Sequence, residues 1–250
     1  MSTRVRAIFL WWLLALLVAS GFASLGHWQL TRMHEKQAML ARMQTALDEA
    51  HPQPLLLASV TAQKSDYDWA AGRGDVSDTT LWLDNQQRNG RVGVRMYCLL
   101  FPDDGVQVLL LDAGWWPLDG RRDLPKARCA AGRAQMVRGM LATPPSEGLV
   151  HGEALAQRGQ GRWLMARTDL AAIVSALQLK AAIAPRVLRL DPMRHDGDTG
   201  VMLASGERDL EILANTMTPE RHLGYAVQWF GLAVCVLVVA AVMTFKKKNA

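Results

Sequence analysis

The sequence lacks the motifs that mark the common enzyme classes. It contains no G-x-S-x-G nucleophile elbow, no phosphate-binding P-loop and no H-E-x-x-H zinc motif. Its six histidines show no metal-ligand spacing: His27, His34, His51, His151, His195 and His222. Because no cluster of acids, bases or nucleophiles stands out, the sequence predicts a protein that is not an enzyme.

The sequence also lacks excess charge away from its two ends. It has 28 Lys and Arg residues against 23 Asp and Glu residues, a net charge of +5. Arg4, Arg6 and the three lysines at residues 246–248 account for this excess, and neither end carries an acid. The rest of the chain is balanced, whereas a nucleic-acid-binding domain gathers basic residues into a patch. We therefore expect no nucleic-acid partner.

Two long stretches, residues 223–245 and residues 7–26, lack charge altogether. As a helix, residues 223–245 would measure roughly 34 Å, enough to cross a hydrocarbon core of about 30 Å. Basic residues flank the outermost end of each stretch, which favours a cytoplasmic location for both ends of the chain. The sequence predicts two antiparallel transmembrane helices, with the segment between them on the far side of the membrane.

The N-terminal stretch has a second interpretation, which is a cleavable signal peptide. Small residues make a weak cleavage site at Ala19, Ser20, Gly21 and Ala23. However, the apolar region is longer than the usual 7–15 residues of a signal peptide. The apolar pattern also continues into an amphipathic helix that we expect to end at about Ala50. We therefore favour a retained membrane anchor.

Turn signals such as Asn89-Gly90 divide the middle of the chain into short segments with strand character. Strands are predicted at residues 79–84, 92–101, 106–112, 135–142, 162–166 and 187–190, and a helix at 169–179. The strand at 106–112 is apolar at nearly every position, so we expect it to be buried on both faces. Residues 63–78, rich in Ala, Gly, Asp and Ser, are expected to form a loop.

The predicted fold class is an α+β membrane protein. Two transmembrane helices, at the N- and C-terminal ends, flank one extracytoplasmic domain built on a small antiparallel β-barrel or curled sheet with one or two helices. The expected boundaries are a cytoplasmic tail at 1–6, transmembrane helices at 7–27 and 222–245, the α+β domain at 28–221, and a second tail at 246–250.

Cysteine is scarce, with three residues in the chain. Cys98 and Cys129 both fall in the outer domain, where a disulfide is chemically permitted. Two buried thiols are the alternative. Cys235 lies inside the second apolar stretch, where we expect it to serve packing.

Two histidines occupy corresponding places at the outer ends of the apolar stretches. Antiparallel helices would put His27 and His222 at the same membrane depth. With Trp28, Tyr225 and Trp229, they are candidate cofactor-binding residues for a flat, amphipathic group such as haem, with an imidazole as axial ligand. The alternative is that both imidazoles bind water or lipid headgroups at the interface.

The residues around these histidines resemble a known family. The segment from His222 to Ala233 is similar to the C-terminal signature of the Surf1 family. Gly26-His27-Trp28-Gln29-Leu30, with Arg32 and Lys36, resembles the family's N-terminal motif, and the segment from Val106 to Pro117 resembles its central strand. Later landmarks of the family fit Trp163-Leu164, Asp169-Leu170 and Pro185. The resemblance covers essentially the whole chain.

The resemblance implies a non-enzymatic assembly factor for a haem–copper cytochrome c oxidase. It implies a bacterial plasma (inner) membrane location, with the main domain in the periplasm. Haem a would be held transiently for insertion into the oxidase's large subunit, with His222 as a ligand of the haem iron. The expected partners are the cytochrome c oxidase subunits, especially the large haem-bearing subunit, together with haem A synthase and the lipid bilayer.

Two alternatives stay open. One is a cofactor-free scaffold or accessory subunit that grips oxidase helices through Trp11, Trp12, Trp229 and Phe230. The other, an enzyme of haem or lipid metabolism, lacks an acid–base or nucleophile cluster.

The chain departs from the family's pattern at its central turn. The family usually shows Asn-Arg before its Gly-Trp, whereas this chain has Asp112-Ala113. The missing guanidinium removes a partner for a haem propionate or an acidic surface. Arg88, Arg91 and Arg95 are the nearby arginines that could replace it.

Overall fold

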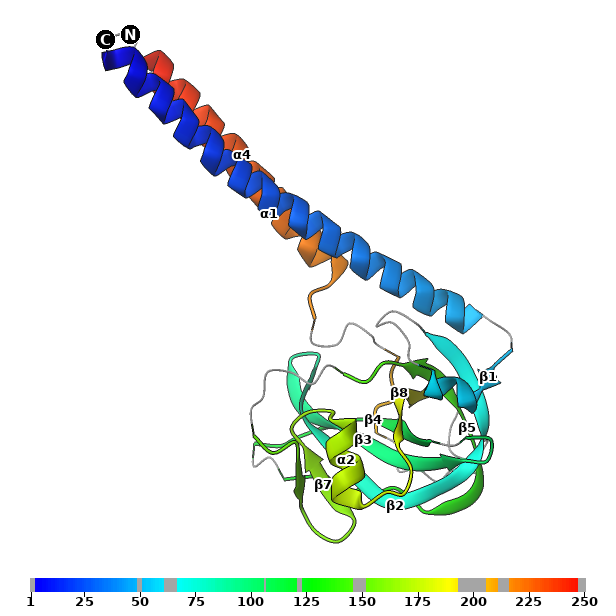
Figure 1. Cartoon of the computed structure of the whole chain (residues 1–250). Helices are drawn as coiled ribbons and strands as arrows, with labels where there is room; N and C mark the ends of the chain where they lie inside the picture. The colour runs from blue at the N-terminus through cyan, green and yellow to red at the C-terminus, as the bar shows by residue number, and fades with distance from the viewer. Residues whose placement is uncertain are drawn as a thin grey trace. The chain divides into compact units, whose positions relative to one another are not determined.

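The computed structural model describes residues 3–48, 51–60, 67–105, 107–120, 123–145, 152–192, 206–210 and 216–246. It divides the chain into a helix unit, Met1–Leu40 with Thr216–Ala250, and a sheet unit, Ala41–Asn215. The coarse fold class is confirmed, because the protein is α+β with a long apolar helix near each end and a sheet domain between them (Figure 1). The unit borders lie inside the predicted 28–221 domain.

The two apolar stretches form the long helices α1 (Thr3–Asp48) and α4 (Pro219–Lys246). Helix α1 runs without a break from the apolar stretch into the amphipathic segment, as predicted, and the expected end at Ala50 lies outside the described residues. Both helices are long and apolar enough to cross a membrane. Exposed apolar side chains such as Phe9, Leu17 and Val227 cover their outer faces. These features are compatible with a membrane anchor.

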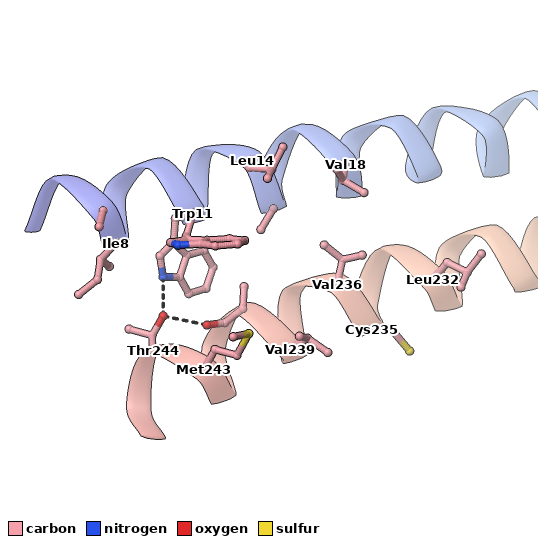
Figure 2. Close-up of a pocket in the computed structure, with 14 residues that line it drawn as sticks. Ile8, Trp11, Leu14, Val18, Leu232, Cys235, Val236, Val239, Met243 and Thr244 are labelled. Atoms are coloured by element: carbon pink, nitrogen blue, oxygen red, sulfur yellow. Dashed lines mark hydrogen bonds between the residues drawn. The ribbon is translucent and has the colours of Figure 1, made fainter. Parts of the chain in front are cut away.

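Helices α1 and α4 pack against each other in an antiparallel arrangement. Near the chain ends, Trp12 Nε1 donates a hydrogen bond to Thr244 Oγ1 at 3.1 Å (Figure 2). Closer to the other end of the pair, Gly26 lies against Phe230, and a Cβ at this glycine would come within 2.9 Å of the ring. Small buried side chains on both helices let the backbones approach closely: Ala15, Ala19, Ala226 and Ala233.

The sheet unit combines eight strands with two short helices among its described residues. The strands are β1 (Gln53–Pro54), β2 (Asp68–Arg88), β3 (Arg91–Pro102), β4 (Val108–Pro117), β5 (Gly132–Ala142), β6 (Leu155–Gln157), β7 (Arg162–Met165) and β8 (Ile183–Leu190). The helices are η1 (Leu55–Ser59), a 3₁₀ turn, and α2 (Leu170–Leu177). Asp169 caps α2 by accepting a hydrogen bond from the Ala172 N–H at 2.9 Å.

Strand pairing closes on itself. The order β3-β4-β8-β5-β2 is completed by direct pairing of β2 with β3, so that five strands form a ring of hydrogen-bonded neighbours (Figure 1). The long strand β2 makes this possible, because its first half pairs with β5 and its second half with β3. The predicted hairpin turn is confirmed at Asn89-Gly90, where both residues have positive φ.

The expectation of an antiparallel sheet is wrong in part, because the sheet is mixed. Strand β8 pairs with β4 in parallel, and β7 pairs with β2 in parallel. Parallel neighbours need a long crossover connection. The chain between β4 and β8 provides one, and this connection contains β5, β7 and α2.

The loop expected at residues 63–78 is a second correction, since β2 begins at Asp68. Small residues serve packing in this part of the strand. A Cβ at Gly72 would come within 2.8 Å of the Leu55 side chain, and one at Gly74 would collide with the Phe101 carbonyl. The glycines that suggested a loop are therefore explained by close packing, because Leu55 and Phe101 leave no room for larger side chains at these positions of the strand.

Two apolar clusters cover the two faces of the central strands. One contains Trp82, Met96 and Leu111, and the other, which includes α2, contains Leu81, Leu110 and Ile173. Alternate residues of one strand enter opposite clusters. This arrangement confirms that the strand around 106–112 is buried on both faces, because β4 is buried from Val108 to Trp115.

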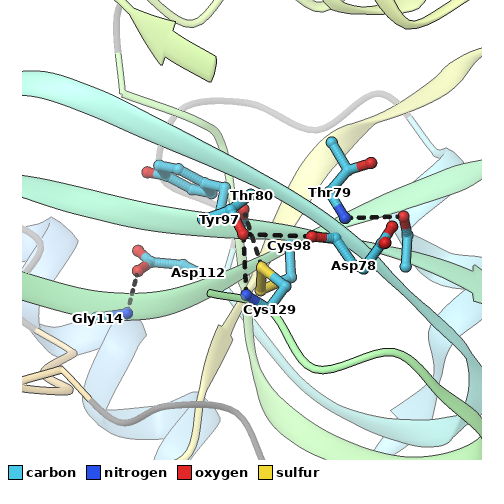
Figure 3. Close-up of a disulfide and its surroundings, with 9 residues drawn as sticks. Asp78, Thr79, Thr80, Tyr97, Cys98, Asp112, Gly114 and Cys129 are labelled. Carbon is cyan, nitrogen blue, oxygen red and sulfur yellow. Dashed lines mark hydrogen bonds between the residues drawn. A yellow bond between two sulfur atoms is a disulfide. The ribbon is translucent and has the colours of Figure 1, made fainter. Parts of the chain in front are cut away.

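A disulfide joins Cys98 of β3 to Cys129, which lies in the connection before β5 (Figure 3). Both residues are buried. The Cys129 N–H also donates to Thr80 Oγ1 at 2.9 Å, which ties the same connection to β2. The alternative of two buried thiols is therefore set aside. Cys235, by contrast, is exposed on α4.

Candidate functional site

The imidazole of His222 is buried in the helix unit. It lies in the first turn of α4 and is 7% exposed. Its Nδ1 lies 2.7 Å from Oε1 of Gln29 on α1, and Gln29 is 8% exposed. Within the described part of the chain, no hydrogen bond engages His222 Nε2. Nδ1 therefore has a fixed hydrogen-bond partner, and Nε2 is free to bind a ligand.

His27 lies near this contact along α1, but on another side of the helix. It precedes Gln29 by two residues, which corresponds to a rotation of about 200° around an α-helix. The His27 side chain is accordingly exposed, while Gln29 faces His222. The structure thus puts the two imidazoles at similar levels of the helix pair without bringing them together.

The three aromatic candidates differ in their surroundings. Trp229 is half-buried and stacks on Phe22 of α1, with ring centroids 5.6 Å apart. Trp28 is exposed, and the Arg32 guanidinium lies 6.0 Å from its ring centroid. Tyr225 is exposed one turn after His222. Trp229 therefore helps to join the helices, while Trp28 and Tyr225 present aromatic surface outward.

Gln29 was not among the candidate residues drawn from the sequence, although a signal for it exists. The buried positions of α1 recur at Ala19, Gly26, Gln29 and Met33, at helical spacing. Gln29 is the polar residue on this otherwise apolar seam. A polar side chain in a row of buried helix positions needs a hydrogen-bond partner, which the facing helix can supply.

A groove lies between α1 and α4 near the chain ends (Figure 2). It encloses about 460 Å³, and most of its lining is apolar, including Trp11, Val18 and Val239. The Trp12–Thr244 hydrogen bond occupies the polar groups at one end. The groove offers an apolar surface, and its lining contains no charged side chain.

A cluster of buried charges occupies one face of the sheet unit. The Arg95 guanidinium donates to Asp112 at 2.9 Å and to Asp209 at 3.1 Å, and Arg95 and Asp112 are 6% and 4% exposed. Arg189 donates to the other oxygen of Asp209 at 2.7 Å. Burial opposes the positive charge on Arg95, but nearby Asp112 holds its pKa above the ordinary value.

This charged cluster joins residues 206–210 to the strands. Glu207 exchanges two backbone hydrogen bonds with Trp115, and its carboxylate accepts one from Arg88 at 2.8 Å. Arg88 and Arg95 therefore already hold carboxylates, and Arg91 lies over the Trp115 ring at 5.8 Å. Asp112, which stands where the family usually has Asn, takes part in this cluster, so its role here is to bind arginines.

Tyr97 adjoins the cluster and should make the stability of the sheet unit depend on pH. Its side chain is fully buried, and burial raises the pKa of its phenol well above the usual value of about 10. Above about pH 10, Tyr97 loses its proton in the unfolded chain and keeps it in the folded chain. The free energy of unfolding therefore falls as pH rises. We expect a slope up to about 1.4 kcal/mol per pH unit steeper than in Tyr97→Phe. Equal slopes in denaturant titrations of the two proteins would contradict this expectation.

The described residues contain no group of three or more His, Cys, Asp or Glu side chains that could hold a metal ion by themselves.

A search among curated proteins finds no match. The family model described as the SURF1 family matches residues 16–234, nearly the whole chain, from the first apolar helix through the sheet unit into α4. That family is known for cytochrome oxidase assembly, as assembly factors rather than catalysts. The chain belongs to the SURF1 family.

Proposed function

We propose that the protein is a membrane-anchored assembly factor for a haem–copper cytochrome c oxidase, which holds haem a through His222 before insertion into the large subunit. Family membership supports the oxidase-assembly part of this proposal. The observation that carries the haem part is the buried imidazole of His222, whose Nδ1 is bonded to Gln29 while Nε2 is open.

The residues present fit a haem group. Haem supplies an iron that takes a neutral imidazole nitrogen as axial ligand. His222 would provide Nε2, and metal-bound histidines usually hydrogen-bond through their other nitrogen. Trp28 and Tyr225 present exposed aromatic surface at this end of the helices, suited to the apolar face of a macrocycle. We include His27 and Trp229 among the residues around the bound group.

The proposed location is a bacterial plasma membrane, with both chain ends in the cytoplasm and the sheet unit in the periplasm. The five basic residues at the two ends support this orientation. The disulfide between Cys98 and Cys129 supports an oxidising compartment for the sheet unit, since such bonds are rare in the cytosol. The proposed partners are the large oxidase subunit and haem A synthase.

A cofactor-free scaffold is the second candidate, and the outer surface of α1 favours it. Trp11 is 62% exposed although it also lines the groove beside α4, so its exposed surface could contact transmembrane helices of the oxidase. Trp12 and Trp229 are less suited to that role, because each already contacts the facing helix.

Affinity purification in mild detergent from cells that make haem a tests the proposal. We expect the full chain to co-purify with oxidase subunits and to show the visible absorbance of haem a. A colourless protein that still brings down the oxidase would favour the scaffold. Failure to recover any oxidase subunit would contradict both candidates.

A further inference from the structure

The hydrogen bond between Gln29 and His222 joins the two buried polar residues of the helix unit. Among the described residues of that unit, all other buried side chains are apolar. An unpaired polar group on such a seam would cost free energy, so each residue needs the other. The contact lies where close packing brings the helices together, since Gly26 meets Phe230 nearby.

The chemistry of this contact decides which imidazole nitrogen carries the proton. The atom of Gln29 that faces Nδ1 is the amide oxygen, which accepts hydrogen bonds and cannot donate them. A neutral imidazole with a proton on Nδ1 has its lone pair on Nε2. The contact therefore selects the tautomer in which Nε2 carries no proton and its lone pair is free to bind a metal.

We propose that Gln29 is the positioning residue of His222: it holds the proton on Nδ1, fixes the ring, and leaves the Nε2 lone pair available to a metal. This inference rests on the proposed function in that haem iron is the metal meant. Gln29 would act on the metal through His222, which it contacts directly. Removal of such a second partner typically weakens metal binding about 10- to 100-fold.

Side-chain variants separate this role from simple packing. Gln29→Leu keeps approximate size and removes the acceptor, while Gln29→Glu keeps an oxygen that accepts from Nδ1. Gln37→Leu is a matched control, because Gln37 is exposed on the same helix. A purely structural role would make both Gln29 variants unstable in proportion to their packing, without a defined effect on the tautomer.

The test is nitrogen NMR of the full chain in detergent, with histidine labelled at both ring nitrogens and the His222 signals identified by His222→Ala. We expect wild type and Gln29→Glu to carry the proton on Nδ1, and Gln29→Leu to lose this preference. A proton on Nε2 in the wild type would overturn the proposal, because Gln29 would then donate its amide to Nδ1.

Titration of the same proteins with haemin gives the second measurement. We expect Gln29→Leu to bind about 10- to 100-fold more weakly than wild type, with Gln29→Glu within about tenfold of it and Gln37→Leu unchanged. Equal affinity of wild type and Gln29→Leu would overturn the positioning role. If the tautomer responds as expected but no protein binds haemin, the positioning of the ring stands and the proposed haem function fails.

Discussion

Replacement of Asp112 by alanine should lower the free energy of unfolding of the sheet unit by about 3–5 kcal/mol, the usual cost of leaving a buried charge without its partner. Asp112 is 4% exposed and accepts hydrogen bonds from Arg95 at 2.9 Å and from the Gly114 N–H at 3.1 Å. Its loss leaves the buried Arg95 guanidinium with Asp209 alone.

Denaturant unfolding of the full chain in detergent, followed by near-ultraviolet circular dichroism, measures this effect. Asp104→Ala is the control, since Asp104 is exposed in the turn after β3. Adding Arg95→Met to Asp112→Ala should recover part of the loss, because the uncompensated charge is then gone. A cost for Asp112→Ala no larger than that of the control would show that the cluster does not hold the sheet unit together.

Removal of the disulfide should have an effect of similar size. Cys98 and Cys129 are 31 residues apart, and closing a loop of that length stabilises a folded chain by roughly 4 kcal/mol in the chain-entropy model. We expect Cys98→Ala with Cys129→Ala to lower the unfolding free energy by about this amount. Reductant should lower the stability of the wild type and leave the double variant unchanged.

Cys235→Ala is the matched control, because this cysteine is exposed on α4 and is not bonded to another. Its stability should equal that of the wild type with and without reductant. If reductant has no effect on the wild type, the two cysteines do not form the bond that the structure shows.

Local sequence signals predicted the elements that depend on local physics. Uncharged stretches predicted α1 and α4, and Asn89-Gly90 predicted the hairpin between β2 and β3. The first half of β2 was missed because its glycines are there for packing against Leu55 and Phe101, which are far away in sequence. The parallel pairing of β4 with β8 was missed for the same reason, since it depends on a long crossover.

The sequence singled out candidate residues for the site, but not the contact that the structure shows between two of its helices. Position along the two apolar stretches singled out His222 and His27, but depth alone does not give the side of a helix. The buried seam through Gly26, Gln29 and Met33 was the missing information, and it explains why Gln29 rather than His27 meets His222. The cluster around Arg95 could not be derived from the sequence, because its partner Asp209 comes from a distant segment.

The visible absorption spectrum of full-length protein from cells that make haem a, compared with that of His222→Ala, tests the proposed haem-holding role most directly. We expect wild type and His34→Ala, a control at an exposed histidine of α1, to carry haem a. We expect His222→Ala to carry at least about tenfold less haem a per protein than the wild type. Bound haem a in His222→Ala equal to that in the wild type would contradict His222 as the ligand.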